Sequence, residues 1–262
     1  MQATSLNPAV RGHVSEAAPR KTYARLIGAL FLIGFLTYGT GFGLINSVIT
    51  AADFPANIAA VQTTLLIGGF LMLLNTVVDI GKGVLFFPIL EHHGRRTAFV
   101  YLAAIVVQVV FLDIGALFLL MLVPLSQIAA DAGASSAAWA PGIASLLTES
   151  NTLAYNIGQA TLSFGGVFLC ILLFRTRLIP QLLAGLGVLG YVMHAAGAVS
   201  EIFGLQISLY LLIPGAIFEV GIAFWLIFKG FSTAVLADGS NSSVTAQGGA
   251  SGETIAPVGV AS

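Results

Sequence analysis

Ionisable and amide side chains interrupt segments that are otherwise apolar, and the tightest group of them is Asn75, Asp79 and Lys82. Their spacing of i, i+4 and i+7 places all three on one face of a helix. Asp79 and Lys82 are close enough to form an ion pair within that helix. An ionised group at the centre of a bilayer costs at least about 2.5–3.5 kcal/mol on insertion scales, so it normally faces a partner or water.

The later apolar segments contain further polar side chains, namely Gln108, Asp113, Asn156, Gln159, Ser163, His194 and Glu219. A rise of 1.5 Å per residue from the basic end of each segment converts sequence position into depth. The inner layer, about 12–16 Å deep, comprises Asp79, Lys82, Gln108 and Glu219. The outer layer, about 22–24 Å deep, comprises Asn75, Asp113, Gln159 and His194.

Two interpretations of these layers remain open. In the first, they line a polar pathway in which two acids near Lys82 exchange a proton, and His194 beside Asp113 extends the relay outward. In the second, Lys82 neutralises both Asp79 and Glu219, and the amides hydrogen-bond neighbouring helices together. The pathway requires one solvent-connected cavity, whereas the packing interpretation requires a dry interior.

Signatures of catalysis and of cofactor binding are missing. Of four histidines, only His194 stands within an apolar segment, so a metal site is not expected. The single cysteine, Cys170, excludes an internal disulfide and a cysteine cluster. The nucleophile motif Gly-x-Ser-x-Gly is absent, and Gly81-Lys82-Gly83 lacks the spacing of a phosphate-binding loop. We predict no catalytic residue, no metal and no cofactor, and the sequence favours a protein that is not an enzyme.

The composition indicates which elements position these side chains. The 262 residues are 57% hydrophobic and only 8% charged, where a soluble domain carries about 25% charge. The mean hydropathy is +0.97, and a net charge of −1 gives no support for nucleic-acid binding. Backbone polar groups in lipid must be satisfied internally, so we expect an all-α, polytopic membrane helix bundle.

Six apolar runs are long enough to span a bilayer as helices, at residues 24–49, 64–90, 97–125, 152–174, 178–200 and 207–229. Polar and Gly/Ser-rich ends predict disordered cytoplasmic segments at 1–23 and 231–262, flanking a transmembrane domain at 24–230. Basic residues precede the first run, follow the second, fourth and sixth, and are absent from the three opposite connections. The positive-inside rule then places both termini in the cytoplasm.

Two further features are open to more than one interpretation. The long connection at residues 126–150 predicts a short interfacial helix over 129–147 with Trp139 at headgroup level, or alternatively a functional lid. Gly39, Gly41 and Gly43 favour close backbone packing, with a broken helix that lines a site as the alternative.

Several short motifs together resemble a known family. They are Arg25-Leu-Ile-Gly28, Asp79, Arg175-x4-Pro180, Gly185 to Gly190-Tyr191, and Pro214 to Glu219 followed by Trp225 and Lys229. The chain resembles the bacterial membrane proteins grouped as domain of unknown function 4386. The resemblance implies a six-helix domain of the bacterial inner membrane without an established activity, in which Asp79 and Glu219 are typical positions. Members often have histidine in the fourth helix, where this chain has Gly165 and Gly166.

The main hypothesis is therefore a multi-pass inner-membrane protein that acts as a proton-coupled or small-solute transporter or channel around Asp79, Lys82 and Glu219. Its expected partners are the lipid bilayer and a proton or small solute. The alternative is a non-catalytic structural or interaction subunit, in which the same charges hold the bundle together or bind a partner helix. An enzyme would need a bound metal.

Overall fold

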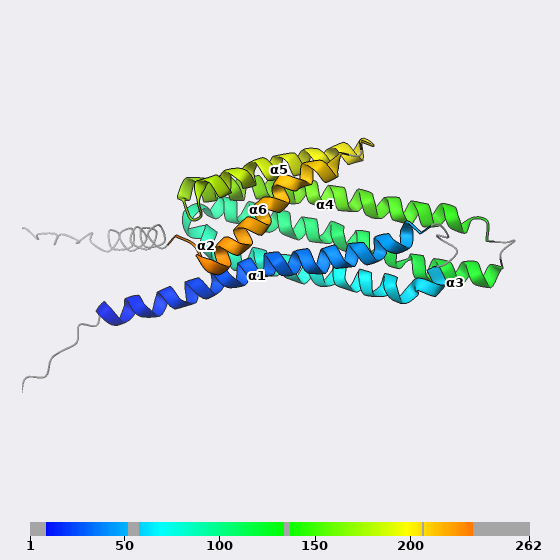
Figure 1. Ribbon diagram of the computed structural model, residues 1–262, viewed down its shortest axis with the longest axis horizontal. Coiled ribbons are helices and arrows are strands. Elements are labelled where there is room, and N and C mark those ends of the chain that lie inside the picture. Colours follow the sequence, from blue (N-terminus) through cyan, green and yellow to red (C-terminus); the bar gives the residue numbers. More distant parts are fainter. Residues whose placement is uncertain (1–8, 52–57, 134–136, 206, 233–262) are drawn as a thin grey trace, which may run out of the picture.

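The computed structural model describes residues 9–51, 58–133, 137–205 and 207–232, with side chains from residues 21 and 61 onward in the first two ranges. All regular elements in these ranges are helices, which form the elongated bundle in Figure 1. They are α1 (Ala9–Ile49), α2 (Ile58–Leu120), α3 (Leu122–Ala132), α4 (Ala140–Thr176), α5 (Gln181–Ile202) and α6 (Ser208–Phe228). Five helical stretches of the described chain are long and apolar enough to cross a membrane, which is consistent with a membrane protein.

The helix α2 is folded back on itself. Its 63 residues are interrupted at Gly94, where the backbone is extended (φ −177°, ψ 77°). The first arm, residues 58–93, lies against the second arm, residues 95–120. A Cβ added at Gly83 would lie 3.0 Å from the Leu102 and Ile105 side chains, and one added at Gly69 would lie 2.6 Å from Leu120. The two arms correspond to the predicted apolar runs at 64–90 and 97–125.

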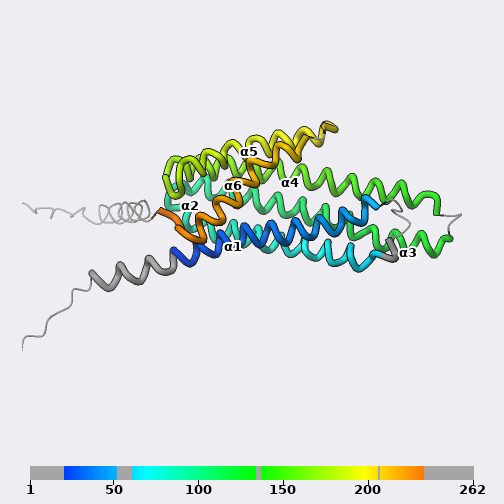
Figure 2. The backbone as a smooth tube through the Cα atoms, in the orientation of Figure 1, coloured from blue at the N-terminus to red at the C-terminus, as the bar shows by residue number. Residues whose placement is uncertain are grey.

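The helical rods pack in a ring in the order α1, first arm of α2, second arm of α2, α4, α5 and α6, and α6 returns to α1. Figure 2 shows α6 crossing from the free end of α5 back to α1. Glycines permit the closest approaches, and close contacts between helices occur at Gly28 with Ala223, Gly41 with Gly68, Gly165 with Ala104, Gly166 with Tyr191, and Gly190 with Gly215. Because small residues let backbones approach, these positions explain how helices with few charged pairs fit together.

Apolar side chains fill two core clusters, one toward each end of the bundle. At the end that holds the turn of α2, Phe86 makes edge contacts with Phe31, Tyr101 and Phe231 at centroid distances of 6.2, 5.9 and 5.9 Å. Phe231 reaches this cluster because the chain turns at Gly230 (φ 76°) after α6. Residues 230–232 therefore pack with the bundle, although the tail was predicted to begin at 231.

Many large apolar side chains are exposed on the outside of the bundle, among them Leu36, Phe70, Val77, Leu209 and Phe228. An apolar surface of this extent is unusual for a soluble monomer, and it is the surface that a lipid environment covers. Polar residues that are buried or half-buried within the bundle form the candidate site described below.

The predicted interfacial helix over 129–147 is wrong. Gly133, with a positive φ of 77°, ends α3, and Pro141 lies in the first turn of α4, so the two helices separate where one was expected. Trp139 immediately precedes α4. Proline is favoured in the first turn of a helix, and Ala144 and Leu147 are buried in the second core cluster, so α4 begins well before the predicted start of the run at 152.

The start of the first helix and the packing of the glycines in its second half also differ from the expectation. The first helix begins at Ala9, well before the expected run at 24, and the residues that precede it lie outside the described part of the chain, as do residues 233–262. Of the three glycines predicted to pack closely, only Gly41 does so. A Cβ added at Gly39 or Gly43 would meet nothing within 4 Å, whereas one at Gly41 would lie 2.8 Å from the Gly68 carbonyl oxygen.

Candidate functional site

An ion pair lies inside the bundle between the two core clusters. Lys82 Nζ is 2.8 Å from Asp79 Oδ1, and the two side chains are only 12% and 7% exposed. Asn75 Nδ2 donates to Asp79 Oδ2 at 3.0 Å. These contacts confirm the predicted face of Asn75, Asp79 and Lys82, with the i, i+3 pair formed within the first arm of α2.

The residues around this ion pair also contact α1. Thr37 Oγ1 lies 3.3 Å from Asn75 Oδ1 and 2.9 Å from the Ile33 carbonyl oxygen, so its single proton is shared between these acceptors. The Lys82 ammonium also stands 4.6 Å from the centre of the Phe31 ring. A cation above a ring face is attracted by the ring quadrupole, which further stabilises the largely buried Lys82 ammonium.

Glu219 lies on α6 and is held from α5. The Tyr191 hydroxyl donates to Glu219 Oε1 at 3.0 Å. Tyr191 is buried, and its ring packs edge-on against Phe218 at 5.8 Å. Within the described residues Glu219 forms no ion pair, although it is near enough to Lys82 and Asp79 to interact with both electrostatically. The expected direct neutralisation of both acids by Lys82 is therefore limited to Asp79.

The predicted partnership of Asp113 and His194 is not formed. Thr76 Oγ1 donates to Asp113 Oδ1 at 2.7 Å, which ties the two arms of α2 together. His194 is half-buried on α5, and no hydrogen bond or ion pair joins it to another residue in the described chain. Asp113 thus holds the two arms of α2 together, and no hydrogen bond among the described residues connects it to His194.

The helix α4 contributes a polar stripe formed by Asn156, Gln159 and Ser163, all of them buried. Asn156 Nδ2 donates to the Thr152 carbonyl at 2.9 Å. Ser163 Oγ, and Oε1 of the neighbouring arm's Gln108, are buried without a hydrogen-bond partner. Such groups are normally satisfied by protein or by water. The stripe runs toward Glu219. Ser163 lies one helical turn before Gly166, the Tyr191 ring packs against Gly166, and the Tyr191 hydroxyl bonds to Glu219.

Aromatic side chains close the bundle on both sides of this polar region. The Phe86 cluster lies on one side. On the other side, Tyr38 of α1 stacks on Tyr155 of α4 with a centroid distance of 5.8 Å and an interplanar angle of 22°. Phe31 and Tyr38 are two helical turns apart on α1. The Asp79–Lys82 pair lies between them along the helix, because Lys82 contacts Phe31 and because Asn75, which bonds to Asp79, also contacts Thr37.

The sequence prediction of the site did not include Thr37, Thr76 or Tyr191. Threonine in apolar helices usually bonds to its own backbone, so the sequence carries no signal that distinguishes these two. Thr76 and Asp113 stand nearly equal distances before and after Gly94, however. A hairpin predicted to turn at Gly94 would have placed the two side chains opposite each other.

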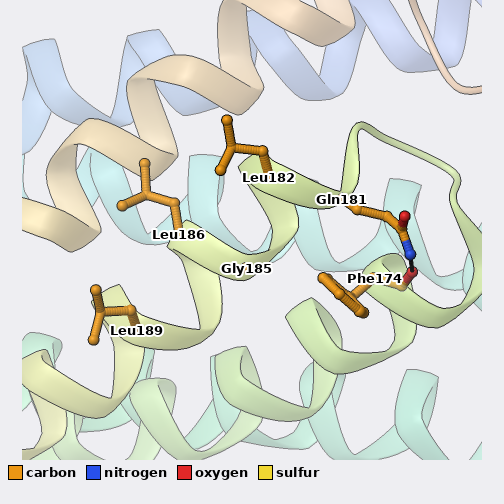
Figure 3. A pocket seen from close by; sticks show the side chains of 6 residues that line it. All are labelled: Phe174, Gln181, Leu182, Gly185, Leu186 and Leu189. Atoms are coloured by element: carbon orange, nitrogen blue, oxygen red, sulfur yellow. Dashed lines mark hydrogen bonds between the residues drawn. The ribbon is translucent and has the colours of Figure 1, made fainter.

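The described residues contain no group of three or more His, Cys, Asp or Glu side chains that could hold a metal ion. Cys170 is buried and unpaired, and its sulfur lies against Gly187 of α5. A separate apolar groove of about 510 Å³ lies on the outer surface where α4 ends and α5 begins. Figure 3 shows its lining, which includes Phe174, Gly185 and three leucines of α5.

The sequence profile described as "Domain of unknown function (DUF4386)" matches residues 26–230. The chain belongs to the DUF4386 family. This confirms the resemblance noted from the motifs, and the DUF4386 region contains the ion pair, Glu219 and the α4 stripe. The search of curated proteins and the search of solved structures found no match.

Proposed function

We propose that this DUF4386 protein is a six-span protein of the bacterial inner membrane with both termini in the cytoplasm. The two arms of α2 lie antiparallel around Gly94, so each arm supplies one span. The turn of α2, the α4–α5 connection and the segment after α6 meet at one end, since Gly94 lies against Leu172 and the Ser232 amide donates to the Leu178 carbonyl at 2.9 Å. The basic residues between helices lie at this end, which favours the cytoplasmic side.

The activity that we propose is proton-coupled movement of a small solute, with Glu219 as the group that binds the proton. The observation that carries this proposal is the uneven distribution of charge. Lys82 is already paired with Asp79, whereas Glu219 accepts a bond from a tyrosine hydroxyl and has no cation in contact among the described residues. At membrane depth a carboxyl group needs a cation or a proton. Proton release from Glu219 would attract the flexible Lys82 side chain away from Asp79 and so change the packing between α1, α2 and α6.

The α4 stripe supports a route between Glu219 and the far side of the bundle. Ser163 Oγ and Gln108 Oε1 have no hydrogen-bond partner within the described residues, and water bound to them would provide steps for a proton along an otherwise apolar wall. The stacked Tyr38 and Tyr155 rings close this route, and the Phe86 cluster closes the cytoplasmic side. In this proposal the structure corresponds to an occluded state, and transport requires the two aromatic closures to open in turn.

The second candidate is a structural or interaction subunit of a membrane assembly. It is favoured by the saturation of the Asp79 carboxylate, which receives both the Lys82 ammonium and the Asn75 amide. Such a network specifies how α1 and α2 pack, with no need for conduction. The two candidates differ in what they require of Glu219, because only transport needs its proton to exchange.

The experiment is proton flux into proteoliposomes that contain the full chain, with Glu219→Gln as the variant and Glu149→Gln as the control. Glu149 is an exposed acid on α4, outside the site. Transport predicts flux that is lost in Glu219→Gln and kept in Glu149→Gln. If the native protein conducts no protons under a pH gradient with candidate solutes present, and Glu219→Gln only lowers stability, the structural role replaces transport.

A further inference from the structure

The groove between α4 and α5 is apolar and open at the side. It is lined by Phe174, Gln181, Leu182, Gly185, Leu186 and Leu189, and Gln181 is the only polar residue among them. Leu182 is 88% exposed, which is extreme for a leucine even on the outside of this bundle. Figure 3 shows Leu182, Leu186 and Leu189 projecting from α5, with the Phe174 ring beside Gly185.

Gly185 creates the groove, and packing does not require a glycine there. A Cβ at Gly185 would make only ordinary contact with the Phe174 ring, at 3.8 Å. The neighbouring glycines of α5 differ, because a Cβ at Gly187 or Gly190 would come within 2.6 Å of Cys170 Sγ or of the Gly215 backbone. Those two positions serve helix packing, whereas the missing side chain at Gly185 leaves space on the outer surface.

Two arginines adjoin the groove. Arg175 and Arg177 are exposed, and they lie between Phe174 and Gln181 in the short connection of α4 and α5. Neither forms an ion pair or a hydrogen bond with another described residue. A third cation, Lys229, is exposed just before the segment that bonds to this connection through Ser232 and Leu178. Apart from Gln181 the groove lining is apolar, and Arg175 and Arg177 are here called the charged rim because they lie in the connection between two lining residues, Phe174 and Gln181.

We propose that this groove binds an acidic phospholipid, with an acyl chain against Gly185 and the leucines and the phosphate at Arg175 and Arg177. Guanidinium groups match phosphate oxygens in a bidentate geometry, and exposed basic residues near the cytoplasmic surface favour acidic over zwitterionic lipid. The inference rests on the proposed membrane orientation and is independent of proton coupling by Glu219.

The test is native mass spectrometry of the full-length protein, released from nanodiscs that contain phosphatidylglycerol and phosphatidylcholine in equal amounts. The variants are Arg175→Gln/Arg177→Gln, which removes the charged rim, and Gly185→Leu, which fills the groove. Arg95→Gln/Arg96→Gln is the matched control, because it removes two exposed arginines at the same end of the bundle. Circular dichroism and gel filtration establish that each variant is folded.

We expect the native protein and the control to retain phosphatidylglycerol in preference to phosphatidylcholine. Each basic residue near an acidic surface strengthens binding about fivefold, so the rim variant should lose on the order of twentyfold in retention. Gly185→Leu should lose retention of both lipids. Equal retention of the two lipids by the native protein, or equal loss in the control, would overturn the proposal. Displacement of the lipid by millimolar inorganic phosphate would assign the arginines to a free anion instead.

Discussion

The contact between Tyr191 and Glu219 joins α5 to α6 through one hydrogen bond of 3.0 Å. Tyr191→Phe removes the hydroxyl and keeps the ring, which packs against Gly166 and Phe218. We expect a loss of about 1 kcal/mol in the free energy of unfolding, together with a change in the pH dependence of proton flux. Tyr210→Phe is the control, since Tyr210 is exposed near the start of α6, outside the site, and no hydrogen bond of its hydroxyl is found within the described residues. If both variants change the flux profile alike, the Tyr191 bond has no specific role.

The Asp79–Lys82 ion pair gives a second prediction at this scale. Lys82→Met leaves a buried carboxylate without its cation and should lower the free energy of unfolding by about 3–5 kcal/mol. The double variant Asp79→Asn/Lys82→Met removes both charges, and we expect it to recover much of that loss. Thermal unfolding in detergent measures both variants. A double variant less stable than Lys82→Met would show that the Asp79 carboxylate is stabilised without Lys82.

At the scale of the helices, the positions of the glycines determine which helices can pack closely against each other. Gly41→Leu should destabilise the bundle by about 1–3 kcal/mol, because its side chain would enter the contact between α1 and the Gly68 backbone. Gly39→Leu adds the same side chain where nothing lies within 4 Å, and it should be nearly neutral. Thermal unfolding of the two variants side by side tests the packing, and equal effects would contradict the α1–α2 contact.

The helices also show what a single sequence can and cannot predict. Asn75, Asp79 and Lys82 interact within one helix, and the helical period alone predicts their contacts. Thr76 with Asp113 and Tyr191 with Glu219 join different rods, so their pairing depends on the turn at Gly94 and on the order of helices around the ring. The early start of α4 was missed because hydropathy measures affinity for lipid. Residues 140–151 mix polar and apolar side chains, and packing of Ala144 and Leu147 in the core stabilises them as helix.

At the scale of the whole molecule, the proposed topology makes a prediction about access. In a Cys170→Ala background, Leu205→Cys in the α5–α6 turn should react with a membrane-impermeant thiol reagent added to intact spheroplasts. Arg96→Cys, next to the turn of α2, should react only after the membrane is opened. Both parent residues are exposed, so a difference reports sidedness. The reverse pattern would place the basic end outside and contradict the proposed orientation.

The central claim is that Glu219 takes up and releases a proton inside the bundle. Infrared difference spectroscopy of the native protein in lipid, recorded through a pH titration, detects the C=O stretch of a protonated carboxyl group. We predict a band that appears as the pH falls, is absent from Glu219→Gln, and persists in Glu149→Gln. A spectrum with no pH-dependent carboxyl band sensitive to Glu219→Gln would show that this residue keeps one protonation state, and it would contradict proton coupling at this site.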